Sequence, residues 1–280
     1  MIEALRELAR RLLAEGRVRV VIGYGRSSPR GPVHPLFVTR AEEADGLVWN
    51  RECFSNLTAY LTRKDVRALG PAAVVVKGCD ERSLAVLEKE SQIEREQLFV
   101  VGMACEGMGE PVLPKCQVCD RHRPRLADET LGDAADREVP AAERYAALQA
   151  FLALPPEERM AYWQEELSRC VKCYACRQVC PMCYCEQCIV DKNRPAVIDT
   201  SATLKGSFAW HITRAFHLAG RCVDCGECAR VCPVGIDLTL LDQSLARAAE
   251  ECYGFRAGED PRVEPLVGSW SPQDREDFIR

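Results

Sequence analysis

Apolar residues follow two periods along the N-terminal half of the chain. Ile2, Leu5, Leu8, Leu12 and Leu13 recur at helical spacing and predict an amphipathic N-terminal helix. Short apolar runs predict buried strands at residues 18–23, 73–77 and 98–102, with a weaker candidate at residues 47–50. Helical patterns lie between them, at residues 51–63 and 81–89. This alternation predicts an α/β domain over residues 1–132, in which helices cover a parallel sheet.

The apolar pattern of the C-terminal half is helical and interrupted. Residues 155–168 predict a helix that starts with proline and carries acidic residues in its first turn. Ser201 is the predicted N-cap of another helix that ends near Leu218. The two histidines of that helix, His211 and His217, are expected to pack or to form hydrogen bonds rather than to bind metal.

The composition is that of a soluble protein, with 47% hydrophobic and 28% charged residues and a net charge of −5. The sequence has no apolar run of about 18 residues, so it predicts no membrane-spanning helix. Charges spaced through the first helix exclude a secretory signal, and we therefore expect a cytoplasmic protein. The acidic net charge argues against a broad surface for nucleic acid.

Cysteine is the outlier, because the chain contains 17. The reducing cytosol keeps thiols free, which disfavours disulfides and leaves binding of metal or iron–sulfur clusters as the expected role.

Two segments repeat one cysteine pattern. Residues 169–181 read RCVKCYACRQVCP and residues 221–233 read RCVDCGECARVCP, with eight of thirteen positions identical. Each has the spacing C-x2-C-x2-C-x3-C-P, in which three cysteines bind one [4Fe–4S] cluster and the fourth binds the partner cluster. The pattern predicts two sites of four cysteines each: site 1 with Cys170, Cys173, Cys176 and Cys232, and site 2 with Cys222, Cys225, Cys228 and Cys180.

This pattern predicts an α+β dicluster ferredoxin-like domain with flanking helices at residues 161–250. Zinc prefers two ligand pairs separated by a long spacer, so it fits the spacing poorly. Residues 133–160 are then a linker and helix start, and residues 251–280 an extended tail with Trp270 and Phe278 as its anchors.

Five further cysteines follow the predicted strands of the N-terminal half. Cys53, Cys79 and Cys105 are spaced 26 residues apart, about one helix and strand, and Cys116 and Cys119 form a CxxC pair. The carboxyl ends of parallel strands are where open α/β sheets place their ligands. We therefore predict a third [4Fe–4S] cluster at site 3, formed by Cys79, Cys105, Cys116 and Cys119, with Cys53 in reserve. Zinc at this site, or simple burial of single cysteines, are the alternatives.

Four cysteines remain. Cys183, Cys185 and Cys188 follow the first repeat directly, and Cys252 lies near the tail. The first three could shield the clusters or form a further site. A fourth cluster fits the count of thiols, but the spacing does not establish it.

No motif for hydrolysis or group transfer is present. Gly23 and Gly25 follow a predicted strand, as in a dinucleotide fingerprint, but Pro29, Gly31 and Pro32 break the helix that such a fingerprint needs. We therefore interpret this segment as a plain turn.

The N-terminal half resembles the beta subunit of coenzyme F-420-reducing hydrogenases and related formate dehydrogenases. The resemblance lies in a Gly102-to-Cys105 turn after a strand, the Cys116–Cys119 pair, and Ala127, Asp128 and Gly132 after it. Residues 165–237 resemble the two-cluster bacterial ferredoxin domain. Beta subunits of that family carry a [4Fe–4S] cluster and FAD, on which the deazaflavin is reduced. This chain departs from the family in lacking the long flavin-bearing C-terminal portion, so the resemblance implies the cluster more directly than FAD.

The resemblance implies a subunit that works beside a hydrogenase, formate dehydrogenase or heterodisulfide-reductase-type partner. We expect an iron–sulfur subunit that relays single electrons between such partners. The alternative is a flavin-containing catalytic beta subunit that reduces a deazaflavin or another small redox substrate. A redox-sensing or cluster-delivery protein is a third class, which predicts exposed and labile clusters.

Overall fold

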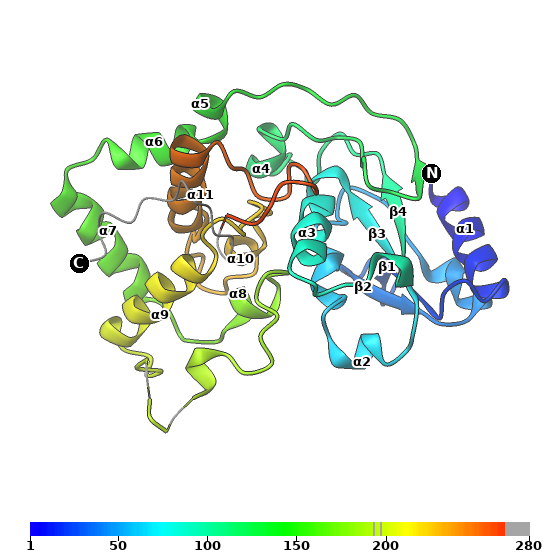
Figure 1. Cartoon of the computed structure of the whole chain (residues 1–280), viewed down its shortest axis with the longest axis horizontal. Helices are drawn as coiled ribbons and strands as arrows, with labels where there is room; N and C mark the ends of the chain where they lie inside the picture. Colours follow the sequence, from blue (N-terminus) through cyan, green and yellow to red (C-terminus); the bar gives the residue numbers. More distant parts are fainter. Residues whose placement is uncertain (193, 197, 267–280) are drawn as a thin grey trace.

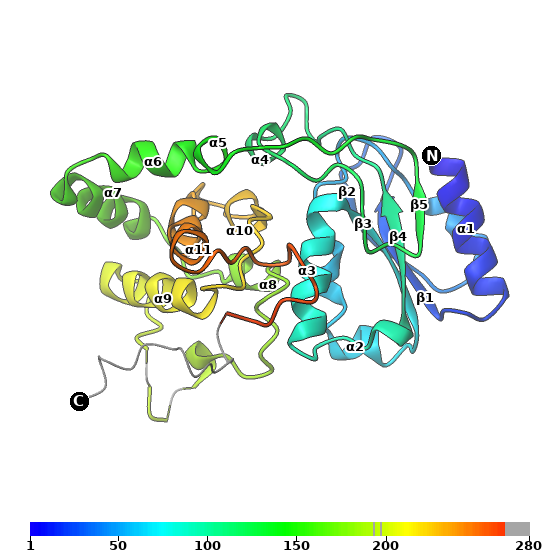
Figure 2. The same cartoon turned by 45° about the horizontal axis from the view of Figure 1, so that its top comes forward.

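The computed structural model describes residues 1–192, 194–196 and 198–266. Figure 1 shows two lobes: an N-terminal lobe built on a β-sheet and a helical C-terminal lobe. The segment that follows the last strand crosses from the first lobe to the second along one side of the molecule in both views (Figures 1 and 2). The chain thus forms two structural units that lie side by side.

The N-terminal lobe contains a five-stranded sheet with the order β2-β1-β3-β4-β5. Four strands run parallel, and β2 pairs antiparallel with β1 at one edge. The strands are β1 (Val20–Arg26), β2 (Val33–Val38), β3 (Ala72–Lys77), β4 (Leu98–Met103) and β5 (Glu129–Leu131). The predicted α/β class is confirmed, although the sheet is mixed rather than wholly parallel.

Two helices cover opposite faces of this sheet (Figures 1 and 2). The predicted amphipathic helix is α1 (Ile2–Ala14), which buries Leu5, Leu8 and Leu12. On the other face lies α3 (Gly78–Lys89), in which nine of the twelve residues are buried, polar ones included. Most of this helix is covered because it lies between the sheet and the C-terminal lobe (Figures 1 and 2).

The C-terminal lobe is built from helices around the two cysteine repeats. Its longer helices pack on one another, with α7 against α9 and α11 against both α6 and α9. Its helices are α5 (Ala141–Arg144), α6 (Ala146–Leu152), α7 (Pro156–Ser168), α8 (Ala175–Gln178), α9 (Leu204–His217), α10 (Glu227–Arg230) and α11 (Thr239–Tyr253). The helix predicted at residues 155–168 is confirmed as α7. The predicted N-cap of α9 was wrong, because the side chain of Thr203, not Ser201, accepts the hydrogen bond from the Gly206 amide.

Short elements complete the described chain. They are α2 (Lys64–Arg67), α4 (Pro114–Gln117) and the 3-10 helices η1 (Ala41–Gly46), η2 (Leu57–Tyr60), η3 (Arg95–Gln97) and η4 (Ile189–Asp191). The helix predicted at residues 51–63 is reduced to η2. The Ser55 carbonyl in this segment accepts hydrogen bonds from Tyr24 Oη (2.5 Å) and Lys77 Nζ (3.1 Å), which hold the backbone in an irregular path.

Other expectations also differ from the structure. Residues 47–50 form no strand and contribute only an isolated bridge between Leu47 and Gly25. Gly23 and Gly25 lie inside β1 rather than in a turn. Strands β2 and β5 were not predicted. Trp270 and Phe278 lie outside the described residues. Among the helices of the described chain, none is long and apolar enough to cross a membrane.

Candidate functional site: three groups of four cysteines

The four cysteines of site 3 line one small cavity. Cys79 is the second residue of α3, directly after β3, and Cys105 follows β4. Cys116 belongs to α4, and Cys119 lies just beyond it. The fold therefore brings together, at the carboxyl ends of two parallel strands, the four thiols that the sequence analysis grouped.

Local geometry explains why these loops meet. A Cβ atom on Gly78 would lie 2.4 Å from the Arg121 carbonyl oxygen, so only glycine allows the loop after Cys119 to approach Cys79. The Cys105 amide donates to the His122 carbonyl at 2.9 Å, and His122 Nδ1 lies 2.7 Å from the Cys105 carbonyl. The loops that carry Cys105 and Cys119 are thus tied to one another.

Cys53, the thiol held in reserve, is not among the residues that line the site 3 cavity. It is fully buried and belongs to the apolar core cluster of the sheet, against which Cys105 and Cys116 also pack. Its sulfur accepts a hydrogen bond from the Asn50 amide at 3.4 Å. Its environment is that of a small structural core residue.

Cations and amide groups surround site 3. The buried Lys77 ammonium lines the cavity, lies 2.6 Å from Asp80 Oδ2 and donates to Tyr24 Oη at 2.6 Å. Lys115 lines the cavity as well. The sulfurs of Cys105 and Cys116 accept amide hydrogen bonds from Gly107 (3.3 Å) and Met108 (3.5 Å). Amide donors of this kind, together with burial, are what tune iron–sulfur clusters.

Burial makes the thiols of Cys79 and Cys105 hard to ionise. It raises the pKa of the Cys105 thiol to about 11 and raises that of Cys79 well above its usual value. Lys77 lowers both pKa values but does not cancel the effect of burial. A bound metal cation favours the thiolate form of cysteine and would offset this effect.

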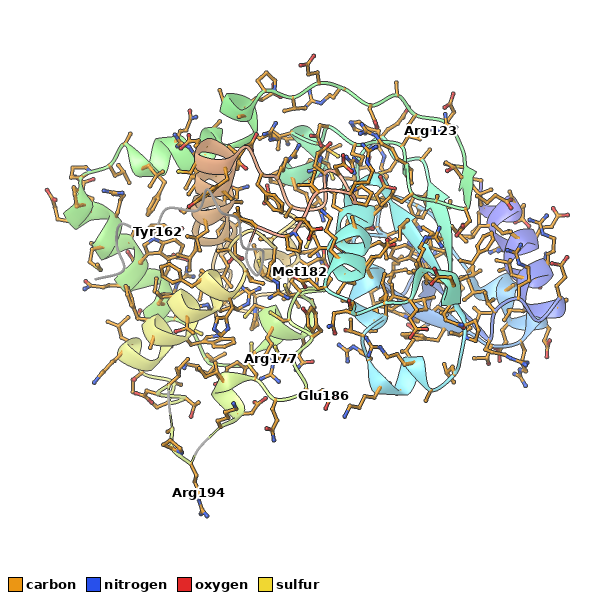
Figure 3. The ribbon with its side chains drawn as sticks, viewed as in Figure 1. Arg123, Tyr162, Arg177, Met182, Glu186 and Arg194 are labelled. Carbon is orange, nitrogen blue, oxygen red and sulfur yellow. The ribbon has the colours of Figure 1, made fainter. Side chains whose placement is uncertain are left out.

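The four cysteines of site 2 line a second small cavity. Three come from the second repeat, and the fourth, Cys180, comes from the first. Cys180, Cys222 and Cys225 also share one apolar cluster with Met182 and with Leu87 of α3. Figure 3 shows Met182 where the two lobes meet.

Three of the four site 1 cysteines, Cys170, Cys176 and Cys232, share another apolar cluster, with Leu167 and Trp163. Cys173, the fourth, is exposed. In both sites the fourth cysteine thus packs with the cysteines of the other repeat, which is the crossed arrangement that the spacing predicts. Their role as ligands stays a prediction.

The two repeats share an unusual backbone. Lys172 and Asp224 occupy the same motif position and both have a left-handed φ, 54° and 56°. Tyr174 and Gly226 occupy another shared position, with φ values of 56° and 69°. Two left-handed residues between the first three cysteines thus give both loops the same backbone turn at these positions.

His211 contacts site 1, with Nε2 3.3 Å from Cys170 Sγ. Burial, followed by the charges of Arg214 and Lys172, lowers the pKa of its imidazole to about 4. A neutral ring can donate one N–H to the sulfur, which agrees with the predicted hydrogen-bonding role.

Sequence reasoning did not identify Lys77, Lys115 or Asp242 as site residues. A charged residue, Lys77, at the end of an otherwise apolar strand could have indicated that this strand ends at a functional site.

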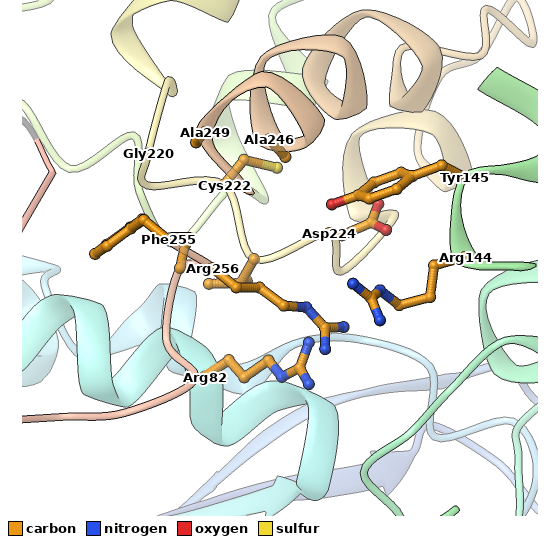
Figure 4. A pocket seen from close by; sticks show the side chains of 12 residues that line it. Arg82, Arg144, Tyr145, Gly220, Cys222, Asp224, Ala246, Ala249, Phe255 and Arg256 are labelled. Carbon is orange, nitrogen blue, oxygen red and sulfur yellow. The ribbon is translucent and has the colours of Figure 1, made fainter. Parts of the chain in front are cut away.

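Beside site 2 lies a small pocket with charged lining residues, which Cys222 also helps to line (Figure 4). Arg82, Arg144 and Arg256 point toward one another there, near Asp224 (Figure 4). Burial raises the pKa of the Asp224 carboxyl to about 6, although it accepts hydrogen bonds from Gln243. Arg82 and Arg256 both pair with Asp120 of the N-terminal lobe. Beside this pocket, the Arg256–Asp120 and Arg82–Glu259 ion pairs join the two lobes.

The remaining cysteines are scattered. Cys183 packs in the apolar cluster of site 2, Cys188 is half-buried at the start of η4, and Cys185 and Cys252 are exposed. Within the described residues, no group of three or more His, Cys, Asp or Glu side chains converges as the ligands of a single metal ion do. Thiols around a four-iron cluster each bind a different iron and stand around it rather than at one point.

Comparison with known proteins supports both halves of the resemblance. Residues 166–236 match the family described as "4Fe-4S dicluster domain". The chain is 20% identical to the "F420-dependent formate dehydrogenase subunit beta" of Methanocaldococcus jannaschii, over 83% of this chain and 85% of the relative. It is 22% identical to the "F420-dependent formate dehydrogenase 1 subunit beta" of Methanococcus maripaludis, over 96% of this chain and 94% of the relative. That alignment covers 366 positions, more than the 280 residues of this chain, so the relative contains segments without a counterpart here. The predicted resemblance to an oxidoreductase beta subunit with a dicluster domain is confirmed.

Proposed function

We propose that the chain is an iron–sulfur electron-transfer subunit of a cytoplasmic multi-subunit oxidoreductase of the hydrogenase, formate dehydrogenase or heterodisulfide-reductase type. The observation that carries this proposal is the gathering of cysteines from distant segments of the chain. The four cysteines of site 3 line one cavity, the four of site 2 line another, and three site 1 cysteines share an apolar cluster. [4Fe–4S] clusters bound by these thiols would accept and release single electrons.

The protein's own residues hold the thiols, exclude water and set the local charge. Buried apolar side chains such as Leu87 and Leu167 surround sites 2 and 1. Amide groups donate to the sulfurs of site 3, and Lys77 places a positive charge beside it. Electron transfer needs such tuning rather than acid–base catalysis.

The test is the content of iron, acid-labile sulfide and flavin in anaerobically purified protein. Three four-iron clusters correspond to about twelve irons per chain. Cys105→Ala is expected to remove about a third of the iron and to leave both ferredoxin-type paramagnetic signals. Cys53→Ala is the matched control and is expected to leave the iron content unchanged. Unchanged iron in Cys105→Ala would contradict a cluster at site 3.

A second candidate is a catalytic beta subunit with bound flavin that reduces a deazaflavin or another small substrate. The names of both relatives, which are F420-dependent enzymes, favour it. Stoichiometric flavin in the purified protein would replace the first proposal with this one. Absence of flavin together with about twelve irons would reject it.

A further inference from the structure

Lys115 connects two cysteine sites that belong to different lobes. Its side chain lines the cavity of site 3, next in sequence to Cys116. Its Nζ atom donates to the backbone carbonyl of Cys225, a site 2 cysteine, at 2.6 Å, and lies 3.7 Å from Glu227 Oε1. The Lys115 side chain is 20% exposed and that of Glu227 is 2% exposed, so the contact lies in the interior. One ammonium group therefore adjoins both sites.

Helix α3 makes an independent connection between the same two sites. Cys79 of site 3 is its second residue. Val86 and Leu87 lie seven and eight residues later, about 10–12 Å along the helix axis. Both pack in the apolar cluster that contains Cys180, Cys222 and Cys225 of site 2. A single helix thus holds a thiol of site 3 at its start and supports site 2 near its end.

Site 1 lies on the other side of site 2. All members of its apolar cluster fall between residues 163 and 238, in the C-terminal lobe. Cys228 of site 2 belongs to this cluster together with Cys176 of site 1. Site 2 therefore adjoins both of the other sites.

We infer that the three sites are ordered site 3, site 2, site 1, and that Lys115 is the positioning and charge-tuning residue between site 3 and site 2. This inference rests on the proposed electron-transfer function. One electron that moves between neighbouring sites oxidises one by a single unit and reduces the other by the same amount. No covalent bond changes and no proton is required. The Lys115 ammonium stabilises the added negative charge on either side.

The order is tested by paramagnetic resonance of the fully reduced full-length protein, because neighbouring paramagnets broaden and split each other's signals. Loss of site 3 in Cys105→Ala is expected to narrow the site 2 signal and to leave the site 1 signal unchanged. Loss of site 1 in Cys170→Ala is expected to leave the site 3 signal unchanged. Narrowing of the site 1 signal in Cys105→Ala would overturn the order.

The role of Lys115 is tested by redox titration of each signal. In Lys115→Met, the midpoint potentials of sites 2 and 3 are expected to become more negative. A tenfold change in the ratio of reduced to oxidised site at a fixed potential corresponds to about 59 mV for one electron. Lys115→Arg is expected to retain most of the wild-type potentials. Lys172→Met, which removes a lysine beside Cys170, is the matched control and is expected to shift site 1 alone.

The outcomes separate this inference from the proposed function. A protein without iron or paramagnetic signals would overturn the function itself. Three signals whose couplings follow another order would overturn only the order. Unchanged potentials in Lys115→Met, with iron content intact, would overturn the assignment of Lys115.

Discussion

The two cysteine repeats have nearly the same sequence but different surroundings. Val171 and Val223 occupy equivalent positions, yet Val171 is 57% exposed and Val223 is 7% exposed. Lys172 of the first repeat is replaced in the second by the half-buried Asp224, at the same left-handed position. Site 1 thus lies near the surface beside a cation, and site 2 lies inside the protein beside a carboxyl.

This difference comes from residues outside the repeats. The cluster around site 2 includes Val86 and Leu87 from the N-terminal lobe and Ala257 from the segment after α11. Among the described residues, the apolar cluster around site 1 is formed within the C-terminal lobe, by residues such as Trp163 and Phe208. The motif determines which thiols come together, while the tertiary contacts determine the solvent exposure and the charge of their environment.

The largest effect is expected when the one cysteine that each repeat is predicted to contribute to the other site is removed. Cys180→Ala is expected to abolish the site 2 signal and about four irons, although Cys180 belongs to the first repeat. Cys232→Ala is expected to abolish the site 1 signal, although Cys232 belongs to the second. Cys176→Ala and Cys228→Ala serve as uncrossed controls and should remove sites 1 and 2, respectively. Loss of the signal of its own repeat in Cys180→Ala would contradict crossed ligation.

The two valines should differ in their effect on stability. Val223→Ala removes two buried methyl groups and is expected to lower the free energy of unfolding by about 1–3 kcal/mol. Val171→Ala changes an exposed side chain and is expected to stay within about 0.5 kcal/mol of the wild type. Denaturant unfolding under anaerobic conditions measures both. Equal losses would show that the environments of the repeats are alike in solution.

The residues at the shared left-handed position should shift the potentials in opposite directions. Asp224→Asn removes a negative charge that can form beside site 2, and its midpoint potential is expected to become less negative. Lys172→Met is expected to make the potential of site 1 more negative. Each variant therefore raises the midpoint potential of site 2 relative to that of site 1. Redox titrations followed by paramagnetic resonance measure both potentials. Shifts of the same sign would refute the charge argument.

The smallest effect is expected from His211. His211→Phe keeps a ring in the space but removes the contact of Nε2 with Cys170 Sγ. Loss of one hydrogen bond to sulfur is expected to make the site 1 potential slightly more negative and to leave site 2 unchanged. An unshifted site 1 would limit His211 to packing.

Local patterns predicted much of the fold. The amphipathic spacing of Leu5, Leu8 and Leu12 located α1, and the apolar runs located β1, β3 and β4. Edge strand β2 was missed because its sequence, VHPLFV, contains a proline and is only partly buried. The helix predicted at residues 51–63 does not form, because the Ser55 carbonyl accepts hydrogen bonds from Tyr24 and Lys77. These partners are distant in sequence, so the local apolar pattern could not indicate them.

The groups of cysteines, like the strands, could be predicted from local features of the sequence. Spacing of the repeats and position after parallel strands are both local features. The neighbours that tune the sites were not predictable. Lys115 reaches Cys225 across 110 residues of sequence, and Asp242 lies 3.5 Å from Cys228 Sγ from another helix.

The crossed arrangement of Cys180 and Cys232 also constrains how the protein is made. The thiols predicted for site 2 are complete once Cys228 has been synthesised and those of site 1 only after Cys232, whereas those of site 3 are complete once Cys119 has emerged. Domains generally fold from the N-terminus during synthesis. A cluster at site 3 would therefore be able to form first, and Val86 and Leu87 of the N-terminal lobe would then offer an apolar surface on which site 2 packs.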